Sequence, residues 1–482
     1  MILWGRPVAG RFLKAFEPLS RVIPEVKAPE RRVGFTEKLL WTAVALIIYL
    51  VMCEVPLYGI GVGGGQDSLL YYRVIFASNR GSLMELGIGP IVTAGLVLQL
   101  LAGSGFIECD FSNPEDRALF TAASKVLSLV MTGVQASAYL VSGLLGNLNP
   151  TQSIVIFIEL LIAGLILMLL DEMLQKGWGI GSGISLFIVA GVAQRIMLDC
   201  FSTFPAPGSN PMRYQGVITA LIHALITGRT LSDIIVSPLN HPSLIGLAST
   251  IGIFLFVIYA EGVRVELPMA HARYRGFRGR YPIKLLYVSN LPVIFASALF
   301  GNIFFIAQIL WNSYNPDNMN PWLNLLGQFE RREAGPVPVG GLAYYVIAPR
   351  GFADVIENPV KSVIYAVLLI TFCAVFSLTW LEVGGLDPKT IAGQLVDAGM
   401  QIPGFRRSEK PIEMVLRRYI PTVTLLGGIL IGLLAATADF LGAFGTGTGI
   451  LLTVSIIYQY YQILLRERIT EMYPRLQKLL GG

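Results

Sequence analysis

Charged residues are scarce in this chain of 482 residues. Only 14% of the residues are Asp, Glu, Lys or Arg, whereas 54% are hydrophobic. A soluble globular domain typically carries about 25% charged residues. This shortage of charge excludes an ordinary soluble protein and indicates an integral membrane protein built from many helices.

Cysteine, histidine and the common catalytic motifs are also scarce or missing. The four cysteines, Cys53, Cys109, Cys200 and Cys373, are far apart and form no CxxC pair. The sequence therefore predicts neither a disulfide framework nor a metal site. HExxH and GxxxxGK[ST] do not occur, so the patterns of a zinc protease and of a P-loop nucleotide hydrolase are absent. We expect a protein that is not an enzyme and uses no cofactor.

Long apolar runs, in contrast, are abundant. A spanning helix needs about 20 mostly apolar residues, and the hydropathy pattern predicts ten such helices. They cover residues 39–58, 84–102, 119–143, 152–174, 183–202, 244–262, 286–312, 359–381, 419–436 and 440–464. Ahead of the first span, residues 12–25 (FLKAFEPLSRVIPE) indicate either an amphipathic helix on the membrane surface or an ordinary soluble helix.

One apolar run is too short to cross a membrane. Residues 69–76 are mostly apolar but run into Ala77, Ser78, Asn79, Arg80 and Gly81, and a longer apolar run follows directly. A piece of this length cannot anchor in lipid by itself. The pattern predicts a half-helix that folds back into the protein.

Basic residues predict the orientation. With the N-terminus in the cytosol, 27 of the 36 Lys and Arg residues lie on the cytosolic side and eight on the other, with Arg195 inside a span. Cytosolic loops of membrane proteins carry this excess, so both termini are expected in the cytosol. The cytosolic loops 263–285 and 382–418 are the longest and hold six basic residues each. Arginine suits bidentate phosphate contacts, so these loops favour a polyanionic partner, although topology and lipid headgroups alone are an alternative.

Breaks inside the apolar runs leave three functions open. Gly or Pro residues interrupt the runs at 87–90, 179–183, 290–292 and 442–449, which is typical of transporters with inverted repeats. A transporter also needs ionisable groups at mid-membrane, and the candidates are few: Glu159 and Arg195 inside spans, Glu54 and Asp439 near their ends. Aliphatic residues follow the breaks instead, which favours a pore gated by a dry constriction. Plain packing is the third interpretation.

Four stretches resemble a known family. ASNRGSLMELGIGPI (77–91), LDEMLQKGWGIGSGISLF (170–187), LPMAHARYRGFRGRYPIKLLYVSNLPVIFASALFGNIF (267–304) and CAVFSLTWLEVGG (373–385) are similar to the alpha subunit of the eukaryotic Sec protein-conducting channel, the SecY family of endoplasmic reticulum translocons. The resemblance runs from about residue 19 to about residue 461. It is weakest over 203–243 and 314–340.

The resemblance implies the fold: an all-α integral membrane channel with ten helices in two pseudo-symmetric halves, shaped like an hourglass. The first half would cover 39–202 and the second 244–464. A cytosolic segment 1–38, a lumenal loop 203–243 and a cytosolic tail 465–482 complete the chain.

The resemblance also implies site residues. The half-helix becomes a plug formed by Leu69, Leu70, Tyr71, Tyr72, Arg73, Val74, Ile75, Phe76, Ala77, Ser78, Asn79 and Arg80. A full helix would start behind it, from Leu83. The pore ring falls on Ile88, Val92, Ile184, Ile188, Ile294 and Leu452. A lateral gate between spans two, three, seven and eight would be held by the polar cluster Thr93, Gln135 and Asn302.

Partners and location follow from the same resemblance. The ribosome would dock, through its RNA and exit-tunnel proteins, on Arg273, Arg275, Arg278, Arg280, Arg406 and Arg407. Small beta and gamma subunits would complete a heterotrimer in the endoplasmic reticulum membrane. Nascent polypeptides with signal sequences would pass through the pore or leave into lipid, and no small molecule would be a substrate.

A secondary transporter is the alternative function, and a membrane scaffold for ribosomes is a third class. Leu378 departs from the family, where a lysine is usual, so one cytosolic contact at span eight is in doubt.

Overall fold

The computed structural model describes most of the chain. It covers residues 23–31, 33–60, 70–103, 114–141, 148–205, 213–228, 232–235, 241–271, 278–288, 291–332, 335–349, 351–402 and 408–472, with residues 13, 16, 18, 19, 107 and 145 besides. The predicted amphipathic piece 12–25 therefore lies largely outside the described residues, and its two interpretations stay open.

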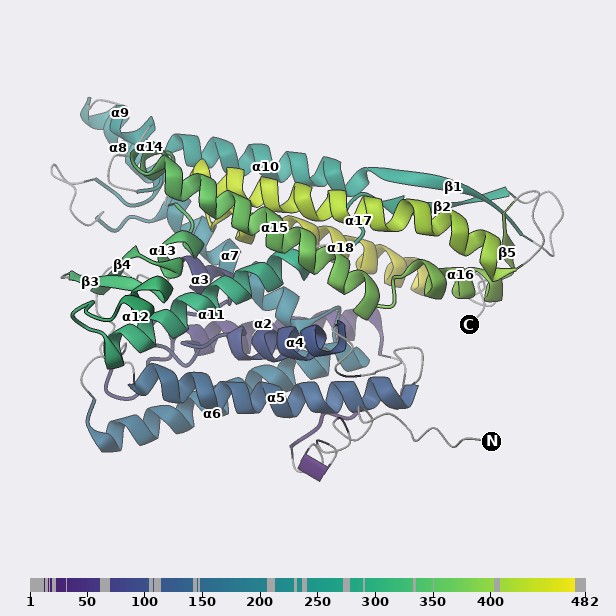
Figure 1. Cartoon of the computed structure of the whole chain (residues 1–482), viewed down its shortest axis with the longest axis horizontal. Helices are drawn as coiled ribbons and strands as arrows, with labels where there is room; N and C mark the ends of the chain where they lie inside the picture. Colours follow the sequence, from purple (N-terminus) through teal and green to yellow (C-terminus); the bar gives the residue numbers. More distant parts are fainter. Residues whose placement is uncertain are drawn as a thin grey trace.

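Long helices lie side by side along one direction (Figure 1). Each of the ten predicted spans falls on a helix: α2 (Phe35–Glu54), α4 (Gly89–Gly103), α5 (Pro114–Val141), α6 (Pro150–Met173), α7 (Gly183–Phe201), α10 (Leu244–Gly262), α11 (Leu291–Tyr314), α15 (Pro359–Val383), α17 (Glu409–Phe440) and α18 (Gly447–Met472). In the described part of the chain, nine helices are long and apolar enough to cross a membrane, and α4, with 15 residues, is shorter.

The outer surface of these helices is apolar. Ile47 and Val51 on α2 are 59% and 56% exposed, and Leu255 on α10 is 61% exposed. Such a surface suits lipid, where helices satisfy their own backbone groups. The α-helical membrane fold predicted from the sequence is confirmed.

Most helices of the two halves of the sequence lie on different sides of the bundle, while α7 of the first half packs on α18 of the second. In Figure 1, α2, α4, α5 and α6 lie in the lower part, whereas α10, α15 and α17 lie in the upper part. Helix α4 packs on α5, and α5 packs on α6. In the second half α15 packs on both α17 and α11. Contacts of α11 with α4 and of α18 with α2 and α7 join the halves.

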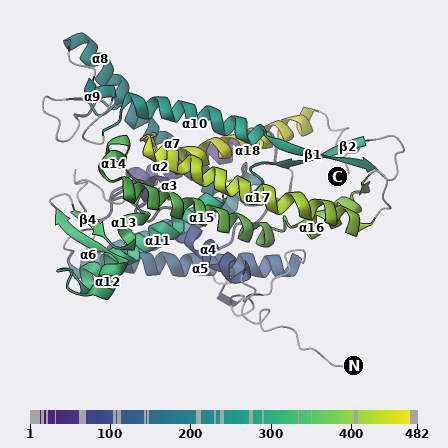
Figure 2. The same ribbon diagram turned by 45° about the horizontal axis from the view of Figure 1, so that its top comes forward.

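Shorter elements gather at the two ends of the bundle (Figures 1 and 2). One end, called here the β1/β2 end, carries β1 (Arg264–His271), β2 (Arg278–Lys284), α16 (Pro388–Asp397) and β5 (Met400–Gln401). The opposite, α12/α14 end carries α8 (Val217–Thr227), α9 (Ser232–Ile235), α12 (Pro321–Leu326), β3 (Gln328–Arg332), β4 (Gly335–Gly340), α13 (Leu342–Val346) and α14 (Phe352–Glu357).

The strands were not predicted from the sequence. Strand β1 pairs antiparallel with both β2 and β5, and β3 pairs antiparallel with β4. Leu267 and Met269 alternate along β1 and are buried together with Ile283 of β2. They form a small core with α16 and the start of α17, so the basic region 263–285 is a hairpin seated on a helix rather than an irregular loop.

Several helix boundaries differ from the prediction; α18, for example, spans Gly447–Met472 rather than 440–464. Two of the differences have a clear physical cause. Helix α17 begins at Glu409, ten residues before the predicted start at 419, because its first turns are polar and raise no hydropathy signal. Helix α4 begins at Gly89 rather than at Leu83 or residue 84. Gly87 has φ +54°, and a Cβ there would lie 2.2 Å from the Phe76 carbonyl oxygen. The chain therefore turns at Gly87 before the helix can start.

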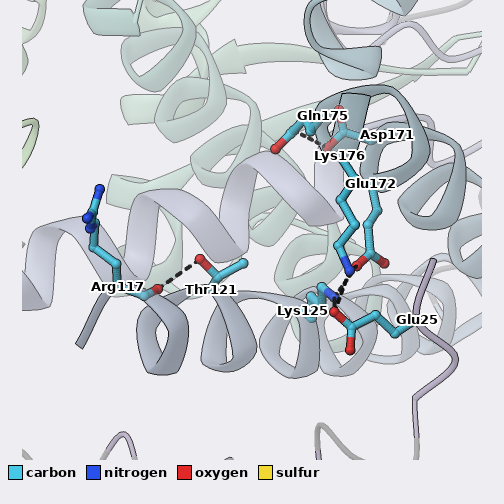
Figure 3. A network of polar contacts seen from close by, with 8 residues as sticks. All are labelled: Glu25, Arg117, Thr121, Lys125, Asp171, Glu172, Gln175 and Lys176. Carbon is cyan, nitrogen blue, oxygen red and sulfur yellow. Dashed lines mark hydrogen bonds and ion pairs between the residues drawn. The ribbon is translucent and has the colours of Figure 1, made fainter. Parts of the chain in front are cut away.

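The N-terminal segment is tied to the first half at the β1/β2 end. Glu25 pairs with Lys125 of α5 at 3.7 Å and with Lys176 of the π-helical turn η1 (Leu174–Trp178), and Glu172 of α6 contacts both lysines (Figure 3). The hydrogen bond from Lys176 holds the pKa of the Glu25 carboxyl below its usual value. The Trp178 indole N–H also donates to the Lys27 carbonyl at 2.8 Å.

Candidate functional site

The half-helix lies inside the bundle. Helix α3 (Leu70–Ile75) has six residues and contacts α7, α11 and α18. Val74 and Ile75 are buried, as is Ala77 directly behind the helix. The helix ends at Ile75, within one residue of the predicted end of the half-helix at 76, and Ala77 behind it takes the left-handed conformation with φ +50°. Leu69 lies outside the described residues, and of residues 70–72 the structure describes the backbone.

Hydrogen bonds hold the segment behind α3 against two spans. The Ile88 amide donates to the Phe76 carbonyl at 2.8 Å. The Tyr49 hydroxyl of α2 donates to the Ala77 carbonyl at 3.1 Å, and the Asn79 side chain donates to the Cys53 carbonyl at 2.8 Å. The segment behind the half-helix is thus joined to α2 and to the start of α4 by individual hydrogen bonds of Phe76, Ala77 and Asn79.

A buried ion pair was not predicted. The Arg73 guanidinium on α3 lies 2.6 Å from Glu85, and the side chains are 9% and 1% exposed. Glu85 also accepts a hydrogen bond from the Gly81 amide. Removing one partner of a buried pair typically costs about 3–5 kcal/mol. The sequence held one signal, since a lone arginine interrupts an otherwise apolar half-helix and Glu85 is the first acid after it.

The six residues of the predicted pore ring belong to one packed cluster. Ile88, Val92, Ile188 and Leu452 are buried, and Ile184 and Ile294 are partly buried against them. They come from the start of α4 and from α7, α11 and α18. Val74 and Ile75 of the half-helix belong to the same cluster. The structure brings these residues together, while their role as a ring stays a prediction.

The predicted polar cluster is assembled around one hydroxyl. Thr93 Oγ1 on α4 accepts from Asn302 Nδ2 on α11 at 3.1 Å and from Gln135 Nε2 on α5 at 3.4 Å. Three helices that are far apart in sequence therefore meet at Thr93. The same three residues line a cavity shared with Arg73 and Glu85, so the polar cluster and the half-helix lie next to each other.

The predicted basic contact residues are only partly described. Arg273, Arg275, Arg406 and Arg407 lie outside the described residues, and Arg278 is described by its backbone alone. The Arg280 side chain is 75% exposed and pairs with Glu266 at 2.7 Å. The hydrogen bond from Arg280 holds the pKa of the Glu266 carboxyl below its usual value. Both residues lie on the β1–β2 hairpin.

The ionisable residues expected of a transporter make separate local contacts. Arg195 pairs with Asp199 at 3.2 Å on α7, and Glu159 accepts from the Tyr58 amide at 3.0 Å. Asp439 accepts from the Tyr365 hydroxyl at 2.9 Å. Among the described residues, no group of three or more His, Cys, Asp or Glu is arranged to hold a metal ion. These contacts build no common ion site.

The chain matches two family models. The SecY model matches residues 82–461, and the model of the plug domain of Sec61p matches residues 47–81. Together they account for most of the described chain, and the second ends within the segment that holds α3.

Solved structures of the same fold are similar along nearly the whole chain. The structure of a protein-conducting channel is 40% identical, with a TM-score of 0.80, over 95% of this chain and 98% of that chain. Sec61 in the canine ribosome–channel complex from the endoplasmic reticulum is 40% identical, with a TM-score of 0.78, over the same shares. The idle yeast Ssh1 complex bound to the yeast 80S ribosome is 25% identical over 93% of each chain, with a TM-score of 0.76.

Proposed function

The chain belongs to the SecY family of protein-conducting channels, and from this premise we propose how its parts work. It conducts polypeptides across a membrane. We place it in the endoplasmic reticulum membrane. The distribution of basic residues predicts that both termini lie in the cytosol. The chain supplies the pore, the seal and the exit to lipid, and it carries out no catalysis and takes no cofactor or small-molecule substrate.

The seal is the first proposed part. Helix α3 and the segment to Arg80 act as a plug on the aliphatic ring. The single observation that carries this proposal is that the plug's buried face and the ring share one packed cluster, held by the hydrogen bond from Ile88 to Phe76. Aliphatic side chains close a pore by dewetting and select nothing by charge, so a polypeptide of any sequence can pass once the plug moves.

The lateral gate is the second part. Two hydrogen bonds on Thr93 hold α4, α5 and α11 together. Interhelical hydrogen bonds in membranes average about 0.6 kcal/mol, so the two supply about 1 kcal/mol. Each Leu or Ile that enters lipid gains about 0.3–0.6 kcal/mol, whereas a central Lys or Asp costs about 2.5–3.5 kcal/mol. A few additional leucines in a translocating segment therefore offset the gate, and one charge reverses the balance.

Partners are the third part. We propose that the basic hairpin β1–β2 and the loop around Arg406 dock on a ribosome, as the assemblies of the similar Sec61 and Ssh1 chains suggest. Their arginines would meet RNA phosphates, which makes the contact salt-sensitive. We also propose small beta and gamma subunits as partners in a heterotrimer, and nascent chains with signal sequences as cargo.

A reversible lock tests the plug. A Cβ atom built on Gly191 of α7 lies 3.7 Å from the Ala77 Cβ, close to the mean of about 3.8 Å in disulfides. In the double variant Ala77→Cys, Gly191→Cys, oxidation should stop translocation and a reductant should restore it. Each single variant, treated identically, is the control. Full translocation through a channel whose disulfide has formed would contradict the proposal that the plug must move.

A further inference from the structure

We propose that α12 and α14 are interfacial helices, whose exposed apolar faces lie in the headgroup layer of the bilayer at the α12/α14 end. Helix α12 contacts α11, and α14 contacts α15. Each thus adjoins the end of a membrane-spanning helix. The partner is the phospholipid surface itself.

Helix α12 turns large apolar side chains outward. Trp322 and Leu325 on this helix are 83% and 72% exposed, and Met319 just before it is 85% exposed. Tyr314, the last residue of α11, is 74% exposed. Tryptophan and tyrosine are enriched at membrane–water interfaces, where one part of the ring system is apolar and another is wet.

The outward position of these side chains is built into the loop. Asn315 Nδ2 donates to Asn324 Oδ1 at 2.7 Å. Asn318 Nδ2 donates to the Phe329 carbonyl at 3.0 Å, and Asn320 Oδ1 accepts from the Trp322 amide at 3.1 Å. These asparagine side chains are hydrogen-bonded within the loop, while the large apolar side chains of Met319, Trp322 and Leu325 stay exposed.

Helix α14 continues a surface that already faces lipid. On α15, Val360, Val363 and Val367 are 68%, 61% and 58% exposed, on the outer side of a membrane span. Ile356 and Phe352 of α14 precede them at steps of four residues and are 66% and 46% exposed. Asn358, between the two helices, has non-helical φ and ψ, so α14 presents a separate apolar face directly beside the valines of α15, within reach of the lipid that covers them.

The length of α11 places α12 at the right depth. Helix α11 has 24 residues, about 36 Å at 1.5 Å per residue, while the hydrocarbon core is about 30 Å thick. The end of α11, and α12 behind it, therefore lie at headgroup level. Each exposed cluster is a few side chains wide. A stable protein partner would need about 800 Å² on each side, so lipid fits these small faces better.

This lipid contact does not depend on the gate. If the proposed function holds, however, α11 and α15 are gate helices, and their attached short helices keep one end of each at a fixed depth. Opening would then move them sideways in the membrane rather than along its normal.

Fluorescence quenching tests the contact. An environment-sensitive label is placed on single cysteines at Leu325 and Ile356, and on matched controls at Asp317 and Glu357, which are exposed polar neighbours. Cys109 is replaced by serine, and Cys53, Cys200 and Cys373 are buried. The protein is reconstituted, without cargo, in phosphatidylcholine vesicles that contain lipids with a nitroxide near the headgroup.

The proposal predicts opposite responses at the two kinds of site. Labels at 325 and 356 should be quenched by the lipid nitroxide at least about twofold more than labels at 317 and 357, and aqueous iodide should show the reverse order. Equal iodide quenching at all four sites would overturn the proposal. The proposal would also be overturned if the labels at 325 and 356 were shielded from iodide in native membranes but not in the reconstituted vesicles. A protein partner, absent from the vesicles, would then cover these faces.

Discussion

At the scale of single residues, the proposed gate is held by two hydrogen bonds on Thr93. Its hydroxyl oxygen accepts both hydrogen bonds, at 3.1 and 3.4 Å, so one side chain links three helices. Hydrogen bonds between membrane helices are weak because the separated helices find other partners. A weak closed state suits a channel that a hydrophobic segment has to open.

Replacing Asn302 by alanine should ease gate opening. The change removes the shorter bond, worth about 0.6 and at most about 1.7 kcal/mol, which is roughly threefold to twentyfold in the closed-to-open ratio. Marginally hydrophobic test segments should then enter lipid more often, as scored by glycosylation of their flanks. Ser297→Ala on the same helix is the control, because the Ser297 hydroxyl makes no hydrogen bond within the described residues. Identical insertion in wild type and Asn302→Ala would argue against the cluster as a latch.

The sequence alone could not have brought these residues together. Thr93, Gln135 and Asn302 are ordinary polar residues on three different spans, and no spacing links them. The resemblance to the SecY family supplied their pairing. The Arg73–Glu85 pair was not predicted, because a charge at a break in a membrane sequence is equally compatible with exposure to water.

At the scale of elements, hydropathy located the spans but not their ends. The start of α4 depends on the turn at Gly87, which packs against Phe76, a contact that no local pattern contains. The hairpin β1–β2 was expected as a basic loop because its arginines mask the alternation of Leu267 and Met269. Helix α17 extends toward the hairpin with polar turns that hydropathy does not detect.

The N-terminal segment 23–31 offers a pH-dependent contact between elements. Glu25 bridges Lys125 and Lys176, while Glu172 completes the network (Figure 3). Since the pKa of Glu25 is lowered from about 4.5, its contribution to docking is fully present above that pH. It is lost as the pH falls through the lowered pKa, where the carboxylate gains a proton.

A spin label at Lys27→Cys, in the Cys109→Ser background, can follow this docking. In the wild-type network the label should remain immobile from pH 7 down to about 5 and become mobile only below the ordinary carboxyl pKa of about 4.5. In a Glu25→Gln background it should be more mobile already at pH 7. Equal immobility of both chains at pH 7 would mean that the Trp178 contact alone holds the segment.

At the scale of the whole molecule, the proposed channel carries a proposed docking face at one end. The β1/β2 end presents the basic hairpin on α16 and α17, and the chain as a whole has a formal charge of +5. A hairpin seated on a long spanning helix gives a partner a firm support. The similarity to chains in ribosome complexes supports a ribosome as the partner that we propose for this end.

Reversing two arginines should weaken ribosome binding. In Arg275→Glu with Arg406→Glu, the affinity should fall, and the slope of log K against log salt should become shallower by about one for each lost phosphate contact. Lys389→Glu with Lys410→Glu removes the same charge from exposed positions at the same end and should have a smaller effect. Co-sedimentation with ribosomes over a salt series measures both. Unchanged binding of the arginine variant at physiological salt would contradict the docking proposal.

We propose that polypeptide passes through the aliphatic cluster at the middle of the molecule, and photocrosslinking to a translocating chain can show whether it does. A photoreactive residue replaces Ile188, which is fully buried in the described structure, and another replaces Leu255 on the lipid-facing surface as a control. With a ribosome-stalled secretory chain, we predict a crosslink from position 188 that requires an intact signal sequence, and none from position 255 to the polar part of the chain. No crosslink from position 188, in a correctly inserted protein with ribosomes bound, would mean that polypeptide does not pass there and that the aliphatic ring is an ordinary core.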